Sequence, residues 1–211
     1  MLLLTTALLP VPLAPEISLY LADAQVGLFD LTGGGFRSDE PPPFWAFVWA
    51  GGQALARYVL DHPPAVHGRT VLDVAAGSGV AAIAAARAGA AAVTAIDLDR
   101  NAAEAIRRNA AANDVAVEAA TMDAAATATT DVLLAGDVFY SPSVAERMTA
   151  VLRDKARAGT RILVGDPGRG YFPERLFDQV AEYVVPVPAA LEEAETLATG
   201  VYEMRATIRA R

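Results

Sequence analysis

The chain has 211 residues, of which 54% are hydrophobic and 20% are charged. This length and apolar content fit one globular domain and exclude a disordered chain. With no cysteine and only two histidines, the sequence excludes disulfides and multi-histidine metal sites, and it leaves a Ser-His-Asp hydrolase almost no material. The net charge of −8 argues against a protein that grips nucleic-acid phosphates and suits a basic protein partner better.

Neither apolar segment of the chain is typical of a targeting or membrane sequence. The first nine residues are apolar, but no basic residue precedes them and three prolines follow between residues 10 and 15. The Ala-rich run over residues 80–95 is interrupted by Arg87 and Gly89, so it is too short and too polar to cross a bilayer. We therefore expect a cytoplasmic protein that does not enter a membrane.

The region before residue 61 differs in character from the rest of the chain. Residues 32–43 form a loop rich in glycine and proline, and residues 44–49 hold both tryptophans of the chain. Residues 50–60 have a helical pattern. We expect residues 1–60 to form an N-terminal cap, with the loop at 33–43 as a lid that is mobile without substrate and ordered with it.

From residue 71 onward, strand-like and helix-like stretches alternate, as in a parallel sheet with helices on its faces. Strands are expected at residues 71–76, 92–97, 115–122, 131–137 and 160–166. Helices are expected from residue 80 to Gly89, at 101–112, after Ser141-Pro142 with Ser143 and Glu146 as a capping box, and at 173–183. Residues 183–188 and 200–209 are predicted to form an antiparallel edge hairpin. The sequence thus predicts one α/β domain over residues 1–211, with a ligand-binding core at 61–211.

A glycine-rich turn comes after the first of these strands. The run Asp73-Val-Ala-Ala-Gly77-Ser-Gly79 leaves the strand and opens a helix. Glycines at such a bend let the backbone approach a ligand, and the helix N-terminus offers free N–H groups. Ala75 stands where a dinucleotide-binding turn has its first glycine, which disfavours a nicotinamide oxidoreductase. Asp73 is better placed to meet an amine, an arrangement associated with the amino-acid end of S-adenosylmethionine.

Acidic residues also come after the next two strands. Asp97 can accept both hydroxyls of a ribose, and Asp99 is a rival for that role. After the third strand, Met122 could cover an adenine while Asp123 accepts from its amine. One such acid alone is more often a helix cap or a turn residue, but three at successive strand ends are more specific. Open α/β sheets bind their ligands along this edge.

The fourth strand ends in Gly136-Asp137-Val-Phe-Tyr140, on the same edge of the expected sheet. A carboxylate attracts an ammonium group, and the face of an aromatic ring stabilises a cation. Asp137 and Tyr140, three positions apart on a turn, could converge on one ligand atom. The alternative is that Asp137 forms the turn and the aromatic residues belong to the core.

Six stretches spread over most of the chain resemble one known family. The chain is similar to the seven-β-strand S-adenosylmethionine-dependent protein methyltransferases of the family-16 group, and most of all to the lysine methyltransferases of the electron-transfer-flavoprotein β subunit and their bacterial relatives. The matching stretches are 13–17, 43–58, 71–79, 95–99, 136–140 and 164–169. Ala50 departs from the family, whose members usually carry proline there.

The resemblance implies a Rossmann-like, seven-stranded, mostly parallel sheet with S-adenosyl-L-methionine as cofactor and S-adenosyl-L-homocysteine as product. The residues it implies for cofactor binding are Trp49, Asp73, Ala75, Gly77, Gly79, Asp97, Leu98, Met122, Asp123 and Gly136. Asp137 and Tyr140 match the family's Asp-x-x-Tyr/Phe substrate motif. No metal, nucleic acid or membrane is implied. The expected partner is a lysine-bearing protein such as the electron-transfer-flavoprotein β subunit.

The expected reaction is an in-line attack of a neutral amine on a sulfonium methyl. Asp137 would position the amine and stabilise the charge that grows on nitrogen, the proton would leave to water, and Tyr140 and Trp49 would exclude solvent. Two alternatives remain open: a small-molecule N- or O-methyltransferase with the same cofactor site, and a binding module without catalysis. The sequence leaves the acceptor, the number of methyl groups added and the oligomeric state undetermined.

Overall fold

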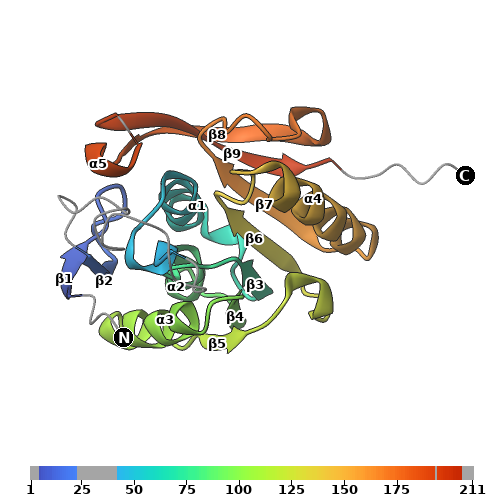
Figure 1. The fold of residues 1–211 in the computed structure, drawn as a ribbon. Coiled ribbons are helices and arrows are strands. Elements are labelled where there is room, and N and C mark those ends of the chain that lie inside the picture. The colour runs from blue at the N-terminus through green and yellow to red at the C-terminus, as the bar shows by residue number, and fades with distance from the viewer. Residues whose placement is uncertain (1–4, 23–41, 193, 206–211) are drawn as a thin grey trace, which may run out of the picture.

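The computed structural model describes residues 5–22, 42–192 and 194–205, so the loop predicted as a lid lies almost wholly outside the described residues. Seven strands form the central sheet in the order β5-β4-β3-β6-β7-β9-β8 (Figure 1). β3 to β7 are parallel, whereas β9 is antiparallel to both β7 and β8. The strands are β3 (Thr70–Val74), β4 (Ala92–Asp97), β5 (Glu118–Thr121), β6 (Val132–Gly136), β7 (Arg161–Asp166), β8 (Phe177–Pro186) and β9 (Thr196–Met204).

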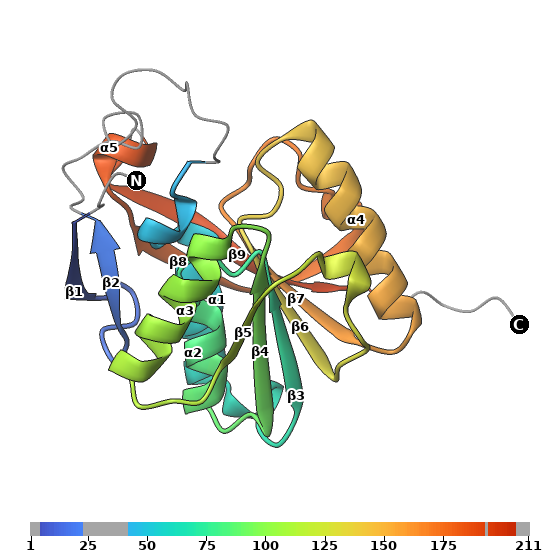
Figure 2. The same ribbon diagram turned by 60° about the horizontal axis from the view of Figure 1, so that its bottom comes forward.

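Helices cover both faces of this sheet, which confirms the predicted α/β class (Figure 2). One face carries α1 (Ala50–Asp61), α2 (Val80–Arg87) and α3 (Arg100–Ala112), and the other carries α4 (Pro142–Arg157). In the part of the chain that the structure describes, a short α5 (Ala189–Glu192) and 3-10 helices lie in the connections, the latter at Phe44–Ala46, Pro63–Ala65, Ala124–Ala126 and Glu174–Leu176. Within the described ranges, none of the helices has the length and apolar character needed to cross a membrane.

The two faces of the sheet are buried in separate apolar clusters, because successive side chains of a strand point to opposite sides. In β6, Leu134 joins α1, α2 and α3 in one cluster, while Leu133 joins α4 in the other. The strands therefore read as continuous apolar runs, as expected when both faces are covered.

An N-terminal hairpin that the sequence did not predict packs against α3. Its strands are β1 (Thr6–Pro10) and β2 (Ser18–Ala22). Two asparagines, one in α3 and one at its C-terminal cap, hold β2: Asn113 bonds to both backbone groups of Ser18, and the Asn109 side chain accepts from Tyr20 N at 2.8 Å. The buried side chains of these two asparagines bond to the backbone of β2 where another strand would otherwise pair. Because both asparagines are distant in sequence, no local pattern in residues 6–22 predicts the hairpin.

The helix predicted at residues 173–183 is wrong. The segment forms a 3-10 turn at Glu174–Leu176 and then β8, which pairs with β9 from Phe177↔Met204 to Pro186↔Thr196. This pairing outweighs the local helical spacing, since strand formation depends on partners distant in sequence. The predicted edge hairpin is confirmed, with a longer first strand than expected.

Two finer predictions also need correction. The cap of α4 is Ser141, whose Oγ accepts from Val144 N, and not a box of Ser143 and Glu146. Pro142 occupies the first helical position, so the residue before it is the cap. β5 is shorter than predicted because the turn at Asp114, with φ of 55°, delays pairing with β4 until Glu118.

Glycines allow α1 to approach the ends of β6 and β7 closely. A Cβ on Gly165 would lie 2.0 Å from the carbonyl oxygen of Gly51, and one on Gly136 would lie 2.8 Å from the nitrogen of Gly52. Both distances are shorter than any real carbon contact, so no side chain fits at either strand end. The start of α1 is thereby fixed against the edge where β6 and β7 end.

We predict that Gly165→Ala destabilises the protein by roughly 3 kcal/mol, because the added methyl group forces α1 away from β7. Urea unfolding followed by circular dichroism measures the loss. The matched control is Gly170→Ala, where an added Cβ meets nothing within 4 Å, and its effect should stay within about 0.5 kcal/mol. Equal stabilities of the two variants would show that the contact does not constrain α1.

Candidate active site

The predicted site residues lie where the parallel strands end. Asp73 lies in β3 and Asp97 closes β4, while Asp123 and Asp137 come just after β5 and β6. Because β3 to β7 run in one direction, these positions share the carboxyl edge of the sheet. A cavity at this edge is lined by Trp49, Gly52, Asp73, Ala75, Ala76, Gly77, Ser78, Val80, Ala81, Gly136 and Asp137.

The turn between β3 and α2 has a left-handed backbone at three positions. φ is 51° at Ala75, 51° at Gly77 and 81° at Gly79, which caps α2 without any side-chain hydrogen bond. An alanine in this conformation is strained, and non-glycine strain of this kind gathers at functional sites. The strained turn brings bare backbone to the cavity wall at the positive end of α2.

Asp73 is buried beneath this turn. Its Oδ2 accepts from Ala82 N of α2 at 3.0 Å, and its side chain contributes to the cavity wall. Burial raises the pKa of Asp73 to about 7, and the nearby carboxylate of Asp97 adds to the rise. Asp73 therefore fixes the start of α2 as well as facing the cavity.

Asp97 bridges the turn and the segment that comes after β4. Its Oδ2 accepts from Gly77 N and its Oδ1 from Asp99 N, both at 3.0 Å. Burial raises its pKa, while these backbone N–H groups oppose the rise. Its rival Asp99 is the cap of α3 and accepts from Asn101 N at 2.8 Å. The carboxylate beside the glycine turn is thus that of Asp97.

The residues expected at the adenine end are more exposed and do not line the cavity. Leu98 is 63% exposed and Met122 is 42% exposed. Asp123 accepts from Ala125 N at the start of a 3-10 helix and forms an ion pair with Arg147. Asp123 therefore has the capping role that an isolated acid commonly has.

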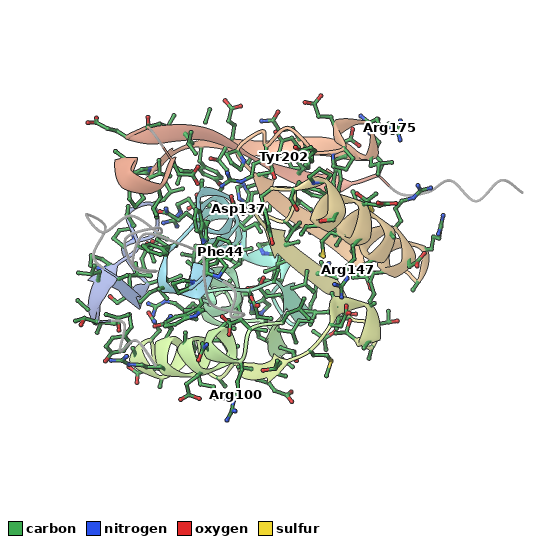
Figure 3. The ribbon with its side chains drawn as sticks, viewed as in Figure 1. Phe44, Arg100, Asp137, Arg147, Arg175 and Tyr202 are labelled. Carbon is green, nitrogen blue, oxygen red and sulfur yellow. The ribbon has the colours of Figure 1, made fainter. Side chains whose placement is uncertain are left out.

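Asp137 is almost enclosed, with 11% of its side chain exposed and φ of 56°. Its Oδ2 accepts from Gly52 N at 3.1 Å, and its Oδ1 accepts from Arg169 Nη2 at 2.9 Å. Burial raises the pKa of Asp137, and the Arg169 guanidinium opposes that rise. Arg169 also pairs with Glu192 of α5 at 2.8 Å. Figure 3 shows Asp137 in the middle of the molecule, whereas Arg100 and Arg175 point outward.

Arg169, Glu192 and Asp166 were not predicted as site residues. Asp166 ends β7, and its Oδ1 accepts from the backbone nitrogens of Gly168 and Arg169, each at 2.8 Å. Burial raises its pKa to about 6, and Asp137 contributes to the rise. Residues 164–169 did match the family pattern, which was the available signal for Arg169. Glu192 reaches the site from the β8–β9 connection, and no local pattern indicates this.

Aromatic residues border the site on its outer side. Trp49 Nε1 donates to Phe44 O at 2.9 Å, and the ring centroids of Phe44 and Trp49 are 5.9 Å apart. Tyr140 is 52% exposed, and its ring centroid lies 6.1 Å from that of Phe44. Burial and the charge of Asp97 raise the pKa of Tyr140. The aromatic rim thus extends from the cavity toward Asp97.

Comparisons with known proteins agree with this architecture. Magnesium protoporphyrin IX methyltransferase from Synechocystis with bound SAH superposes with a TM-score of 0.54 at 18% identity, over 72% of this chain and 82% of that chain. The chain thus has the Rossmann-like fold found in methyltransferases. The sequence pattern of the family described as Ribosomal protein L11 methyltransferase (PrmA) matches residues 54–156.

Sequence relatives define the family. The electron transfer flavoprotein beta subunit lysine methyltransferase of Danio rerio is 39% identical over 154 residues, 69% of this chain and 60% of that protein. Its Caenorhabditis elegans homolog is 31% identical over 202 residues, 82% of each chain. The chain belongs to the family of the electron transfer flavoprotein beta subunit lysine methyltransferases. The match spans only about three fifths of the Danio rerio protein.

Because the pKa of Asp73 is raised, we predict that this residue lowers the stability of the folded protein at higher pH, and that Asp73→Asn removes this pH dependence. The unfolded carboxyl titrates near 4, so the folded state alone keeps the proton between about pH 4 and pH 7, and wild-type stability falls as pH rises through this window. The variant should gain stability relative to wild type by a few kcal/mol between these limits. Urea unfolding of both proteins at about pH 4 and pH 8 measures the change. A pH-independent difference would show that Asp73 titrates normally.

Proposed function

We propose that this chain is an S-adenosylmethionine-dependent N-methyltransferase that methylates lysine side chains of a protein, with the electron-transfer-flavoprotein β subunit as the acceptor. One observation carries the proposal: Asp137, of the motif that resembles the family's substrate motif, lines the same cavity as the strained glycine turn. A cofactor held by the turn and an amine held by Asp137 would meet there. The family to which the chain belongs supports the acceptor class.

The described residues fit this cofactor. Asp97 presents a half-buried carboxylate for the ribose hydroxyls, and the turn at Ala75 to Gly79 offers bare backbone to the methionine end. Leu98 and Met122 are the exposed apolar surfaces that an adenine ring would cover. Gly136 and Trp49 both line the cavity wall. When bound, the cofactor supplies an activated methyl group on a sulfonium.

The chain's own residues then have to present an uncharged amine. A lysine with a pKa near 10.4 is almost wholly charged at pH 7, and leaving it neutral costs roughly 4–5 kcal/mol. Asp137 orients the amine and stabilises the positive charge that develops on nitrogen as the bond to carbon forms. Tyr140 and Trp49 exclude water from the approach, and proximity supplies much of the rate.

Two other acceptors differ only in what the rim of the site admits. A small molecule could reach the cavity past Tyr140 and Phe44, and the match to the PrmA family makes ribosomal protein L11 a second protein candidate.

A module without catalysis would be expected to have lost the turn or Asp97, and both are intact. A cytoplasmic location, a bacterial source, the absence of nucleic-acid binding and the division of the chain near residue 60 stay predictions.

The proposal is tested by incubating the purified protein with methyl-labelled S-adenosylmethionine and recombinant electron-transfer-flavoprotein β subunit. Peptide mass spectrometry should find methylated lysine in that subunit. Ribosomal protein L11 and a lysate of small molecules serve as competing acceptors. Label on neither protein, with cofactor bound, would contradict the acceptor assignment; no binding of cofactor would contradict the proposal as a whole.

We predict that Asp97→Ala weakens binding of S-adenosylhomocysteine by about 2–3 kcal/mol, the value of a charge-assisted bidentate contact. Isothermal titration calorimetry measures the affinity of the folded variant. Asp99→Ala is the matched control, because Asp99 caps α3 instead of facing the turn. If Asp99→Ala loses this affinity and Asp97→Ala does not, the ribose site lies two residues further along the chain.

Asp137→Asn keeps the shape of the side chain and removes its charge. We predict that the methylation rate falls by roughly two orders of magnitude while cofactor affinity changes only a few-fold, since the lost contact acts on the acceptor. Single-turnover kinetics at saturating cofactor measures the rate, and a thermal melt checks that α1 stays anchored through Gly52. A variant that loses cofactor but keeps its turnover would place Asp137 in the cofactor site.

A further inference from the structure

Arg169 lies between two carboxylates at the inner end of the site. Its Nη2 donates to Asp137 Oδ1 at 2.9 Å and to Glu192 Oε1 at 2.8 Å, and its Nε lies 3.3 Å from the same Asp137 oxygen. All three side chains are largely buried: Arg169 is 23% exposed, Asp137 is 11% exposed and Glu192 is 10% exposed. Burial lowers the pKa of Arg169, but the two carboxylates outweigh this and raise it. Arg169 therefore keeps its charge.

The backbone around Arg169 is fixed as firmly as its side chain. Asp166 Oδ1 accepts from the nitrogens of Gly168 and Arg169, which sets the turn after β7. On the other side, Glu192 belongs to α5, whose first turn is closed by a bond from Glu192 N to Pro188 O. Arg169 is thus held from two separate connections and has little freedom to leave Asp137.

This arrangement leaves part of Asp137 available to a ligand. Arg169 occupies Oδ1, whereas Oδ2 accepts only from Gly52 N among the described residues. A carboxylate oxygen can accept two hydrogen bonds, so Oδ2 has one unused position, and Asp137 lines the cavity. An amine can bond to Oδ2 without displacing Arg169.

We propose that Arg169 is a positioning residue that keeps the acceptor amine uncharged beside Asp137, while Glu192 limits how far it does so. The inference rests on the proposed function. An isolated Asp137 carboxylate would favour an ammonium ion, which cannot attack a methyl group because its electron pair is taken. The fixed guanidinium offsets that field and lets Oδ2 accept a hydrogen bond from a neutral amine.

The other charges around the amine come from several elements. Glu192 of α5, Asp166 at the end of β7 and Asp73 of β3 are acidic and favour the ammonium form, although burial raises the pKa of Asp73 and Asp166 to about 7 and about 6. The N-terminus of α1, which donates through Gly52, acts in the same direction as Arg169. Among the charged side chains described at this end of the cavity, Arg169 is the positive one.

Two substitutions should therefore move the titration of the amine in opposite directions. Arg169→Gln removes a positive charge and should raise the pH at which methylation reaches half its maximal rate, by roughly one unit. Glu192→Gln removes a negative charge and should lower that pH by a similar amount. Arg169→Lys keeps the charge and should restore the wild-type profile. A purely structural role for Arg169 would change stability and rate without these opposite shifts.

The titration of the bound amine can also be measured without turnover. The probe is an S-adenosylhomocysteine analogue whose sulfur carries a short aminoalkyl arm labelled with nitrogen-15, and nuclear magnetic resonance follows protonation of the bound amine. The amine should titrate higher in Arg169→Gln and lower in Glu192→Gln than in wild type. If Arg169→Gln fails to fold, the shift in Glu192→Gln alone decides. Binding of the probe with unchanged titration in Glu192→Gln would overturn the inference, whereas failure to bind would contradict the proposed function itself.

Discussion

The close approach of α1 to the ends of β6 and β7 is the contact on which the candidate site depends. Gly51 and Gly165 touch through bare backbone, and Gly136 leaves space for Gly52. This places Trp49, the residue before α1, on the cavity wall, and it lets Gly52 N donate to Asp137. One packing constraint therefore sets both an aromatic border and the carboxylate of the site.

Electrostatics gives the same edge of the sheet its chemical character. Four of the acids gathered there, at positions 73, 97, 137 and 166, are at least partly buried, and burial raises the pKa of each. Backbone N–H groups and Arg169 oppose this rise, so each carboxylate is held by specific donors. Each of these acids therefore lowers the stability of the folded protein as pH rises through its raised pKa.

Much of this could be predicted from the sequence because the relevant signals are local. The strand and turn at residues 71–79 and the strand at 92–97 are indicated by apolar runs bounded by glycines and acids, and they place Asp73 and Asp97 correctly at the sheet edge. The features that could not be predicted depend on distant partners. β8 is a strand only because β9 pairs with it, and Glu192 meets Arg169 only because α5 folds over the site. Asp99 and Asp123 are helix caps, which is the commoner role that the sequence also allows for an acid at a strand end.

In the proposed function, one cleft at the carboxyl edge brings a cofactor's sulfur to Asp137, with the ribose on Asp97. A crystal structure of the protein with S-adenosylhomocysteine measures this directly. We expect both ribose hydroxyls within hydrogen-bond distance of Asp97, the adenine against Leu98 and Met122, and the sulfur facing the unused side of Asp137 Oδ2. A ligand bound elsewhere would overturn this placement, for example in the hollow lined by Thr94 of β4, Arg107 of α3 and Val117 before β5. A sulfur turned away from Asp137 would overturn it as well.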